Sequence, residues 1–152
     1  MVNFFVEAQG IKQAQLRFNR MGAAAVDMSP AFRRIAVFMM AMEEEVFQSQ
    51  GRRGGGSWKP LTPDWLERKA KLGWDLRINI ARGDLMNSVT IWGAKGQRLD
   101  IWPDRMYFGS RLPQAEPSQK YRPFIKFTVA DRERFTQIIG ERFLEAWVAP
   151  VE

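Results

Sequence analysis

The feature that most constrains this chain is the succession of short segments between Arg77 and Val129. Two runs of alternating apolar and polar residues, S-V-T-I-W and R-L-D-I-W, flank the glycine-containing connection G-A-K-G-Q. Alternation of this kind indicates strands with one buried face, and the short connection indicates a hairpin over residues 88–102. Pro103 ends the second run, and the aromatic segment R-M-Y-F-G-S that follows predicts one further strand.

The region before this succession contains a long amphipathic helix. Ser29 followed by Pro30 is typical of a helix start. Apolar residues then recur every three or four positions up to Val46, on a face wide enough to be covered on more than one side. The acidic run Glu43–Glu45 is expected to be solvated or to face a partner.

Three further helices follow from the same kind of pattern. A C-terminal helix is predicted to start at Thr128, with the apolar ladder Phe135, Ile139, Phe143 and Trp147. A short helix is predicted from residue 11 to a stop at residue 22, and another from residue 62 to residue 73.

These elements predict an α+β fold. Residues 2–8, V-N-F-F-V-E-A, place Phe4 and Val6 on one face and Phe5 on the other, which indicates an N-terminal strand. We expect an antiparallel sheet, made of this strand, the central hairpin and one further strand, packed against the long helix and the C-terminal helix. A length of 152 residues suits one domain over residues 1–152.

A loop rich in glycine and arginine is predicted over residues 50–62. Four glycines within six positions hold neither a helix nor a strand cheaply. Ser57 and Trp58 stand where a phosphate-binding loop requires Lys and then Ser or Thr, so that function is rejected. The loop is either a plain linker or a segment that orders on assembly, with Trp58 in a neighbour's pocket. The residues of this loop that we expect at a partner interface are Arg52, Arg53, Trp58 and Lys59.

The composition points away from catalysis. The chain has no His and no Cys, which excludes zinc sites, disulfides and Ser–His or Cys–His catalysis. Asp84, Asp100 and Asp104 lie near predicted strand ends, where Asp is common in turns. We therefore expect a non-enzymatic protein with no catalytic residue, no metal and no cofactor.

The expected compartment is the cytosol. No apolar run approaches the ~20 residues of a membrane span, and the first residues lack the basic start of a signal peptide. The absence of Cys also suits a reducing compartment.

The net charge of +6 is concentrated in one region, because residues 51–82 hold eight basic and three acidic residues. One interpretation is a surface that faces DNA or an acidic partner. The other is a solvated loop followed by a basic helix face. Trp92 and Trp102 pose a similar alternative, because both fall on the polar face of the predicted hairpin. They lie either under a helix or on an intersubunit surface.

The order of these segments resembles the phage virion morphogenesis family, whose members complete the tail and join it to the head. The resemblance covers roughly residues 44–146 and includes three motifs: Gly-x-x-Trp-x-Pro-Leu before a lysine-bearing helix, Gly-x-Leu-x-x-Ser before the hairpin, and Arg-Pro-Phe before the last helix. The matching residues are Gly55, Trp58, Pro60, Leu61 and Lys69 or Lys71; then Gly83, Leu85 and Ser88; then Arg122, Pro123 and Phe124.

Two departures from the family pattern accompany this resemblance. Arg82 replaces a Thr before the second motif, and A-E-P-S-Q-K stands where the family often has His-Gln-x-Gly, with Gln119 as the one suggestive residue. These departures bear on the contacts made by the stretch A-E-P-S-Q-K and on the position that the protein takes in the virion.

The resemblance implies a structural virion protein of the tail or neck, assembled in the host cytoplasm. It implies a ring, most simply a hexamer, at the head-proximal end of the tail, either as a tail terminator or as a head–tail connector. The implied partners are further copies of the chain, the tail tube protein, neck or connector proteins, and genomic DNA in the lumen. The alternative is a basic, non-enzymatic nucleic-acid-binding domain, in which Trp residues stack on bases.

Overall fold

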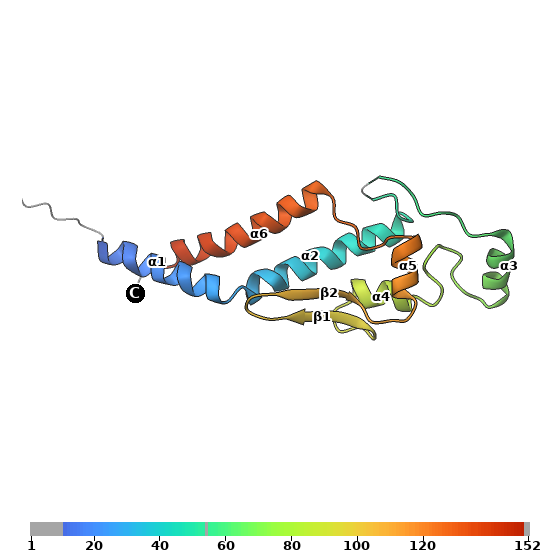
Figure 1. Cartoon of the computed structure of the whole chain (residues 1–152), viewed down its shortest axis with the longest axis horizontal. Coiled ribbons are helices and arrows are strands. Elements are labelled where there is room, and N and C mark those ends of the chain that lie inside the picture. Colours follow the sequence, from blue (N-terminus) through green and yellow to red (C-terminus); the bar gives the residue numbers. More distant parts are fainter. Residues whose placement is uncertain (1–10, 54, 151–152) are drawn as a thin grey trace, which may run out of the picture.

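The structure is a computed structural model that describes residues 11–53 and 55–150. Within these residues the protein is a mostly helical α+β fold with six helices and a single antiparallel hairpin (Figure 1). The helices are α1 (Ile11–Val26), α2 (Ser29–Gln48), α3 (Pro63–Lys71), α4 (Asp84–Thr90), α5 (Ala115–Tyr121) and α6 (Val129–Val148), and the strands are β1 (Gln97–Ile101) and β2 (Met106–Ser110).

The long helix α2 runs through the middle of the molecule and contributes to two apolar clusters. Its first half packs Ala31, Ile35 and Met39 against Ile138 of α6. Its last turn joins the second cluster, which contains Val46, Phe47, Trp58, Ile80, Leu85, Val89, Ala115 and Phe124. The wide apolar face of α2 is therefore covered on more than one side, as its sequence predicts.

The molecule is elongated, because helices extend beyond α2 at both ends (Figure 1). At one end α1 packs along the C-terminal part of α6, where the rings of Phe18 and Trp147 meet edge to face with centroids 5.2 Å apart. At the other end α3 stands away from α2 and α6 (Figure 1). The apolar ladder of α6 is thus shared between α2 and α1.

The hairpin lies alongside α2 and α4. In its register Leu99 pairs with Phe108, and Ile101 pairs with Met106. Met106 and Phe108 pack on the cluster between α2 and α6, which makes their face of the sheet the inner one. The residues of the other face, including Tyr107, alternate outward.

The predicted strand at residues 88–92 is wrong, because this segment belongs to helix α4 and the residues after it. Leu85, Ser88 and Val89 are buried together at spacings of three and four, which is the periodicity of a helix. Gly83, the residue just before the helix, has φ 86° and lies in the left-handed conformation. Tertiary burial therefore overrides the β-branched composition of this run.

The hairpin forms from the second and third predicted strands and not from the first and second. The aromatic run R-M-Y-F-G-S pairs with R-L-D-I-W and supplies the second strand, so the described sheet has two strands and no third one. The predicted N-terminal strand at residues 2–8 lies outside the described residues. Between β2 and α6, the residues Ala115–Tyr121 form the short helix α5.

The predicted starts of the two long helices are confirmed, but only one start uses the expected cap. Thr128 and Asp131 exchange both hydrogen bonds of a capping box. α2 begins at Ser29, but the Ser29 hydroxyl donates to Asp27 Oδ1 at 2.6 Å and caps no helix amide. α1 continues past the predicted stop at Gly22 to Val26.

Gly51 gives a direct test of the packing at the end of α2. It has φ 81°, and a Cβ atom added there would lie 2.5 Å from the Trp58 ring. Gly51→Ala is expected to lower the free energy of unfolding by roughly 2–4 kcal/mol, from backbone strain and overpacking together. Gly55→Ala is the matched control, because Gly55 has φ 85° and no atom within 4 Å. We expect this control to lose only about 1 kcal/mol of unfolding free energy, with both variants measured by denaturant titration. Equal losses of unfolding free energy in the two variants would contradict the Trp58 contact.

Candidate functional site

Two of the motifs that carry the family resemblance are in direct contact. The Trp58 indole N–H donates to the carbonyl of Pro123 at 2.8 Å. The Arg122 guanidinium donates from Nε to the carbonyl of Lys59 at 3.1 Å. Trp58 also packs edge to face on Phe47, whose ring lies 5.8 Å from that of Phe124. Segments 65 residues apart in the chain therefore form one structural unit.

One of the two interpretations of the glycine-rich loop places Trp58 in the pocket of a neighbouring copy, and this contact places it elsewhere. Its side chain is 5% exposed and belongs to the core of its own chain. Trp58 is therefore closed off from a neighbour's pocket in this structure, because Phe47, Phe124 and the Pro123 carbonyl already surround it. Lys59 and Arg52, on either side of it, are exposed.

Arg53 is held by ion pairs and is not free in a mobile loop. Its guanidinium makes two hydrogen bonds to Asp131, at 2.6 and 2.9 Å, and its Nε donates to Glu45 at 2.8 Å. The Arg53 bonds, together with the Thr128 amide and hydroxyl, hold the pKa of Asp131 well below its usual range. The loop predicted over residues 50–62 is thus tied to α6 through Arg53.

Beside this ion pair lies the buried acid Glu43, which the sequence pattern predicts to be at the surface. Glu43 is 0% exposed, and neither carboxylate oxygen has a hydrogen-bond partner among the described residues. Burial raises its pKa to about 8, opposed by the positive charge of Arg53 and assisted by the negative charge of Asp131. The prediction that Glu43 is solvated or faces a partner is therefore wrong. Its neighbours Glu44 and Glu45 are exposed, as predicted.

The position of Glu43 predicts a pH dependence of stability. Its folded pKa of about 8 lies above the ordinary value of 4.5, so its contribution is fully present below pH 4.5 and is lost as the pH rises toward 8. Glu43→Gln removes this titration. Relative to wild type, the variant is expected to gain roughly 2–4 kcal/mol of unfolding free energy between pH 4.5 and pH 8. Glu44→Gln on the exposed face is the control, and parallel curves for wild type and Glu43→Gln would contradict the assignment.

The second family motif holds α4 in place. Leu85 and Ser88 are both buried, and Ser88 Oγ lies 2.7 Å from Leu85 O and 2.8 Å from Ser110 Oγ of β2. Gly83 starts the helix with its positive φ. The motif therefore connects α4 to the hairpin, as a helix in place of the predicted turn and strand.

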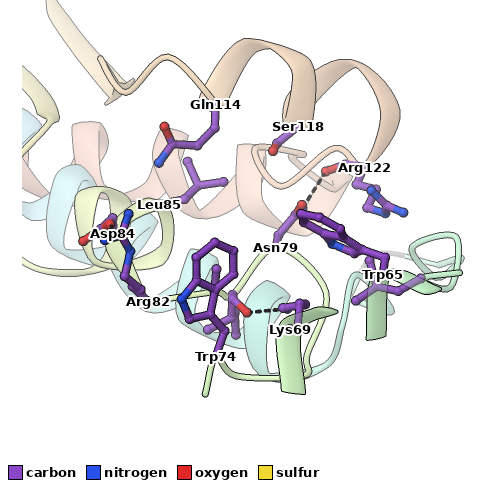
Figure 2. A pocket seen from close by; sticks show the side chains of 13 residues that line it. Trp65, Lys69, Trp74, Asn79, Arg82, Asp84, Leu85, Gln114, Ser118 and Arg122 are labelled. Carbon is purple, nitrogen blue, oxygen red and sulfur yellow. Dashed lines mark hydrogen bonds and ion pairs between the residues drawn. The ribbon is translucent and has the colours of Figure 1, made fainter. Parts of the chain in front are cut away.

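A pocket of about 380 Å³ opens between α3, the segment before α4, and α5. Figure 2 shows Trp65 and Arg122 on one side of this pocket, and Trp74 and Arg82 on the other. Lys69 is 3% exposed and donates to the carbonyls of Arg77 and Ile80 at 2.6 and 2.7 Å. Its burial lowers its pKa.

The charged and aromatic groups that line this pocket are indole rings, guanidinium groups, one ammonium group and one carboxylate. The Lys69 ammonium is already occupied by two backbone carbonyls, and Asp84 lies at 4.0 Å from Arg82 with both side chains exposed. Indole rings and guanidinium groups of this kind suit an aromatic or acidic side chain of a partner. In the described ranges no group of three or more His, Cys, Asp or Glu residues is placed to hold a metal ion.

A second hollow of about 380 Å³, which we call the β1 groove, follows the hairpin. It is lined by Arg33 of α2, Trp92 and Gly93 after α4, Ala94, Gln97, Leu99, Asp100 and Ile101 of β1 and its approach, and Arg111 after β2. Trp92 is 50% exposed, so it lies over the groove and not under a helix.

The outer face of the hairpin carries the second predicted tryptophan. Trp102 is 43% exposed and meets Tyr107 edge to face with centroids 5.7 Å apart. Arg98 lies over the same Tyr107 ring at 4.5 Å. Trp92 and Trp102 are therefore both on the surface of the hairpin region and not under a helix, whereas their place on an intersubunit surface stays a prediction.

Sequence patterns identified some of these residues and missed others. The alternation of R-L-D-I-W located Trp102, whereas Trp92 is exposed although the strand predicted for it does not form. Nothing in the sequence separated buried Glu43 from its exposed neighbours. The burial of Lys69 had a weak signal, because it lies at i+3 and i+4 from the apolar Leu66 and Trp65. No helix in residues 11–53 and 55–150 is long and apolar enough to cross a membrane.

Comparison of the chain with protein-family models, with curated proteins and with solved structures found no match in any of the three. The functional interpretation therefore depends on the motifs and on the geometry of the site.

Proposed function

We propose that this protein is a structural component of a phage virion that completes the head-proximal end of the tail and takes part in head–tail joining. The observation that carries the proposal is the contact between the first and third motifs. Trp58 and Pro123 share a hydrogen bond of 2.8 Å, and Phe124 lies in the same cluster. Residues that define the resemblance thus form the centre of the fold and are not scattered over it.

The surface supports a role in assembly. Large apolar side chains are exposed at both ends of the elongated protomer and on the hairpin, which marks surfaces for protein contacts. On α1 and α6 these are Leu16, Phe18, Val26, Leu144 and Val148; around α3 they are Trp65, Leu66, Leu72 and Leu76; near the hairpin they are Ile91, Trp92, Trp102 and Tyr107. A protomer with different apolar surfaces at opposite ends suits head-to-tail contacts, which close into a ring when the rotation permits.

In the proposed ring, most simply a hexamer, the partners are neighbouring copies, the tail tube and neck or connector proteins. The basic segment then faces an acidic partner surface or the DNA in the lumen. Arg52, Lys59 and Arg82 are exposed and available for this role, whereas Arg53 and Lys69 are engaged within the chain. The proposed role is structural and requires neither a catalytic residue nor a cofactor.

The mass of the native protein tests this proposal. We expect light scattering to show either a discrete ring-sized oligomer, or a monomer that forms one on addition of purified tail tubes, in both low and high salt. Survival in high salt is expected because apolar contacts are not screened by ions. A monomer that ignores tail tubes under all conditions would contradict the proposal.

A basic nucleic-acid-binding domain is the second candidate, favoured by the exposed stack of Arg98, Tyr107 and Trp102. Aromatic and arginine side chains arranged in this way suit stacking on bases. However, Arg98 and Arg111 both pair with Asp100, at 3.6 and 3.0 Å, which reduces the positive charge of this face. The salt dependence of binding separates the two candidates. DNA binding of this kind weakens steeply as the salt concentration rises, whereas the proposed ring is expected to persist in high salt.

A further inference from the structure

The backbone of β1 has one unpaired edge. Trp102 donates its amide to Arg105 at 2.9 Å, and Arg111 donates to Gly96 at 2.7 Å. Hydrogen-bonded and non-bonded pairs alternate in an antiparallel hairpin, so Leu99 and Ile101 point their backbone groups away from β2. Neither the Leu99 amide nor the Ile101 amide has a hydrogen-bond partner among residues 11–53 and 55–150.

The β1 groove lies along this edge. It is lined by Leu99 and Ile101, whose side chains belong to the inner face, and by Asp100, whose side chain belongs to the outer face. A hollow that touches both faces of one strand must run beside that strand. Trp92 and Arg33 form its walls. An exposed strand edge beside a hollow with an aromatic wall is the usual setting for the addition of an extended peptide.

The sequence contains a segment whose pattern fits such an edge. In residues 2–8 the even positions Val2, Phe4, Val6 and Ala8 are all apolar. The odd positions, Asn3, Phe5 and Glu7, include two polar residues. As a strand added to β1, the even set would extend the apolar inner face, and Glu7 would lie on the outer face with the basic residues Arg98 and Arg111.

The chain length before α1 does not allow all of residues 2–8 to lie along β1 of the same chain. α1 joins α2 beside the hairpin turn, where the Met28 amide donates to Pro103 O at 2.9 Å. α1 is 16 residues long, which places Ile11 about 24 Å from this junction. The N-terminal end of α1, which begins at Ile11, points away from the hairpin (Figure 1). The three steps from Ala8 to Ile11 span only about 11 Å.

We propose that residues 2–8 of one copy add a strand to the β1 edge of a second copy. The inference rests on the proposed self-assembly and names the contact that produces it. The donor segment and the acceptor edge lie on different parts of the protomer, so each copy donates at one end and accepts at its middle. Such a contact is heterologous and propagates around a ring.

The absence of Cys allows a clean cross-linking test. Donor variants Asn3→Cys, Phe5→Cys and Glu7→Cys are each mixed with an acceptor variant Arg98→Cys that carries a mass tag, and are oxidised under assembly conditions. A disulfide between the two chains is expected for at least one donor position, and that position gives the register. Gln137→Cys, on the exposed face of α6, is the control acceptor and is expected to give none.

A second measurement uses substitutions at positions 4 and 6, and circular dichroism checks that each variant keeps the helix content of the wild type. The double substitution Phe4→Pro and Val6→Pro removes two strand amides and the extended pattern. It is expected to raise the dissociation constant of the oligomer roughly tenfold or more. The control, Phe4→Val with Val6→Ile, keeps strand-forming residues and is expected to assemble as wild type.

The outcomes separate this inference from the proposed function. A ring that persists in the proline variant, with no cross-link to Arg98→Cys, would overturn the strand addition and leave the ring intact. A disulfide that forms within a single chain carrying both cysteines would also overturn it. A wild-type protein that stays monomeric with and without tail tubes would overturn both proposals.

Discussion

The packing of Trp58 on Phe47 and Phe124 is the interaction on which the rest of this fold depends. It joins the end of α2, the glycine-rich segment and the stretch before α6, which are far apart in the chain. The hydrogen bond from the indole N–H to Pro123 fixes the orientation of the ring. The ion pair between Arg53 and Asp131 then ties the same segment to the first turn of α6. Trp58 and Arg53 thereby attach this glycine-rich stretch of the chain to the core and to α6.

This arrangement explains how surfaces for assembly remain available on a well-packed chain. The core residues lie around α2, so the outer parts of α1, α3 and the hairpin keep apolar side chains exposed. A two-stranded hairpin is marginal by itself, and here its inner face packs against the cluster between α2 and α6. Its β1 edge stays open beside a groove. The proposed ring uses this open edge as the point where copies meet.

Much of the helical part could be predicted from the sequence, because periodicity and capping act locally. The start of α2, the capping box at Thr128 and the ladder of α6 follow directly from residue spacing. The alternation predicts the hairpin one segment too early, because S-V-T-I-W has the composition of a strand. Its burial pattern depends on contacts of Leu85, Ser88 and Val89 with distant segments. The burial of Glu43 could not be predicted from the sequence for the same reason, since long-range packing decides which side of a helix is covered.

The central claim is that copies of this chain meet at the β1 edge, and amide hydrogen exchange tests it most directly. The amides of Leu99 and Ile101 exchange with solvent when the edge is open and are slowed when a strand covers it. The account predicts that residues 97–101 become protected when the protein assembles, while the exposed α3 helix does not. Unchanged exchange at Leu99 and Ile101 in a fully assembled ring would contradict it.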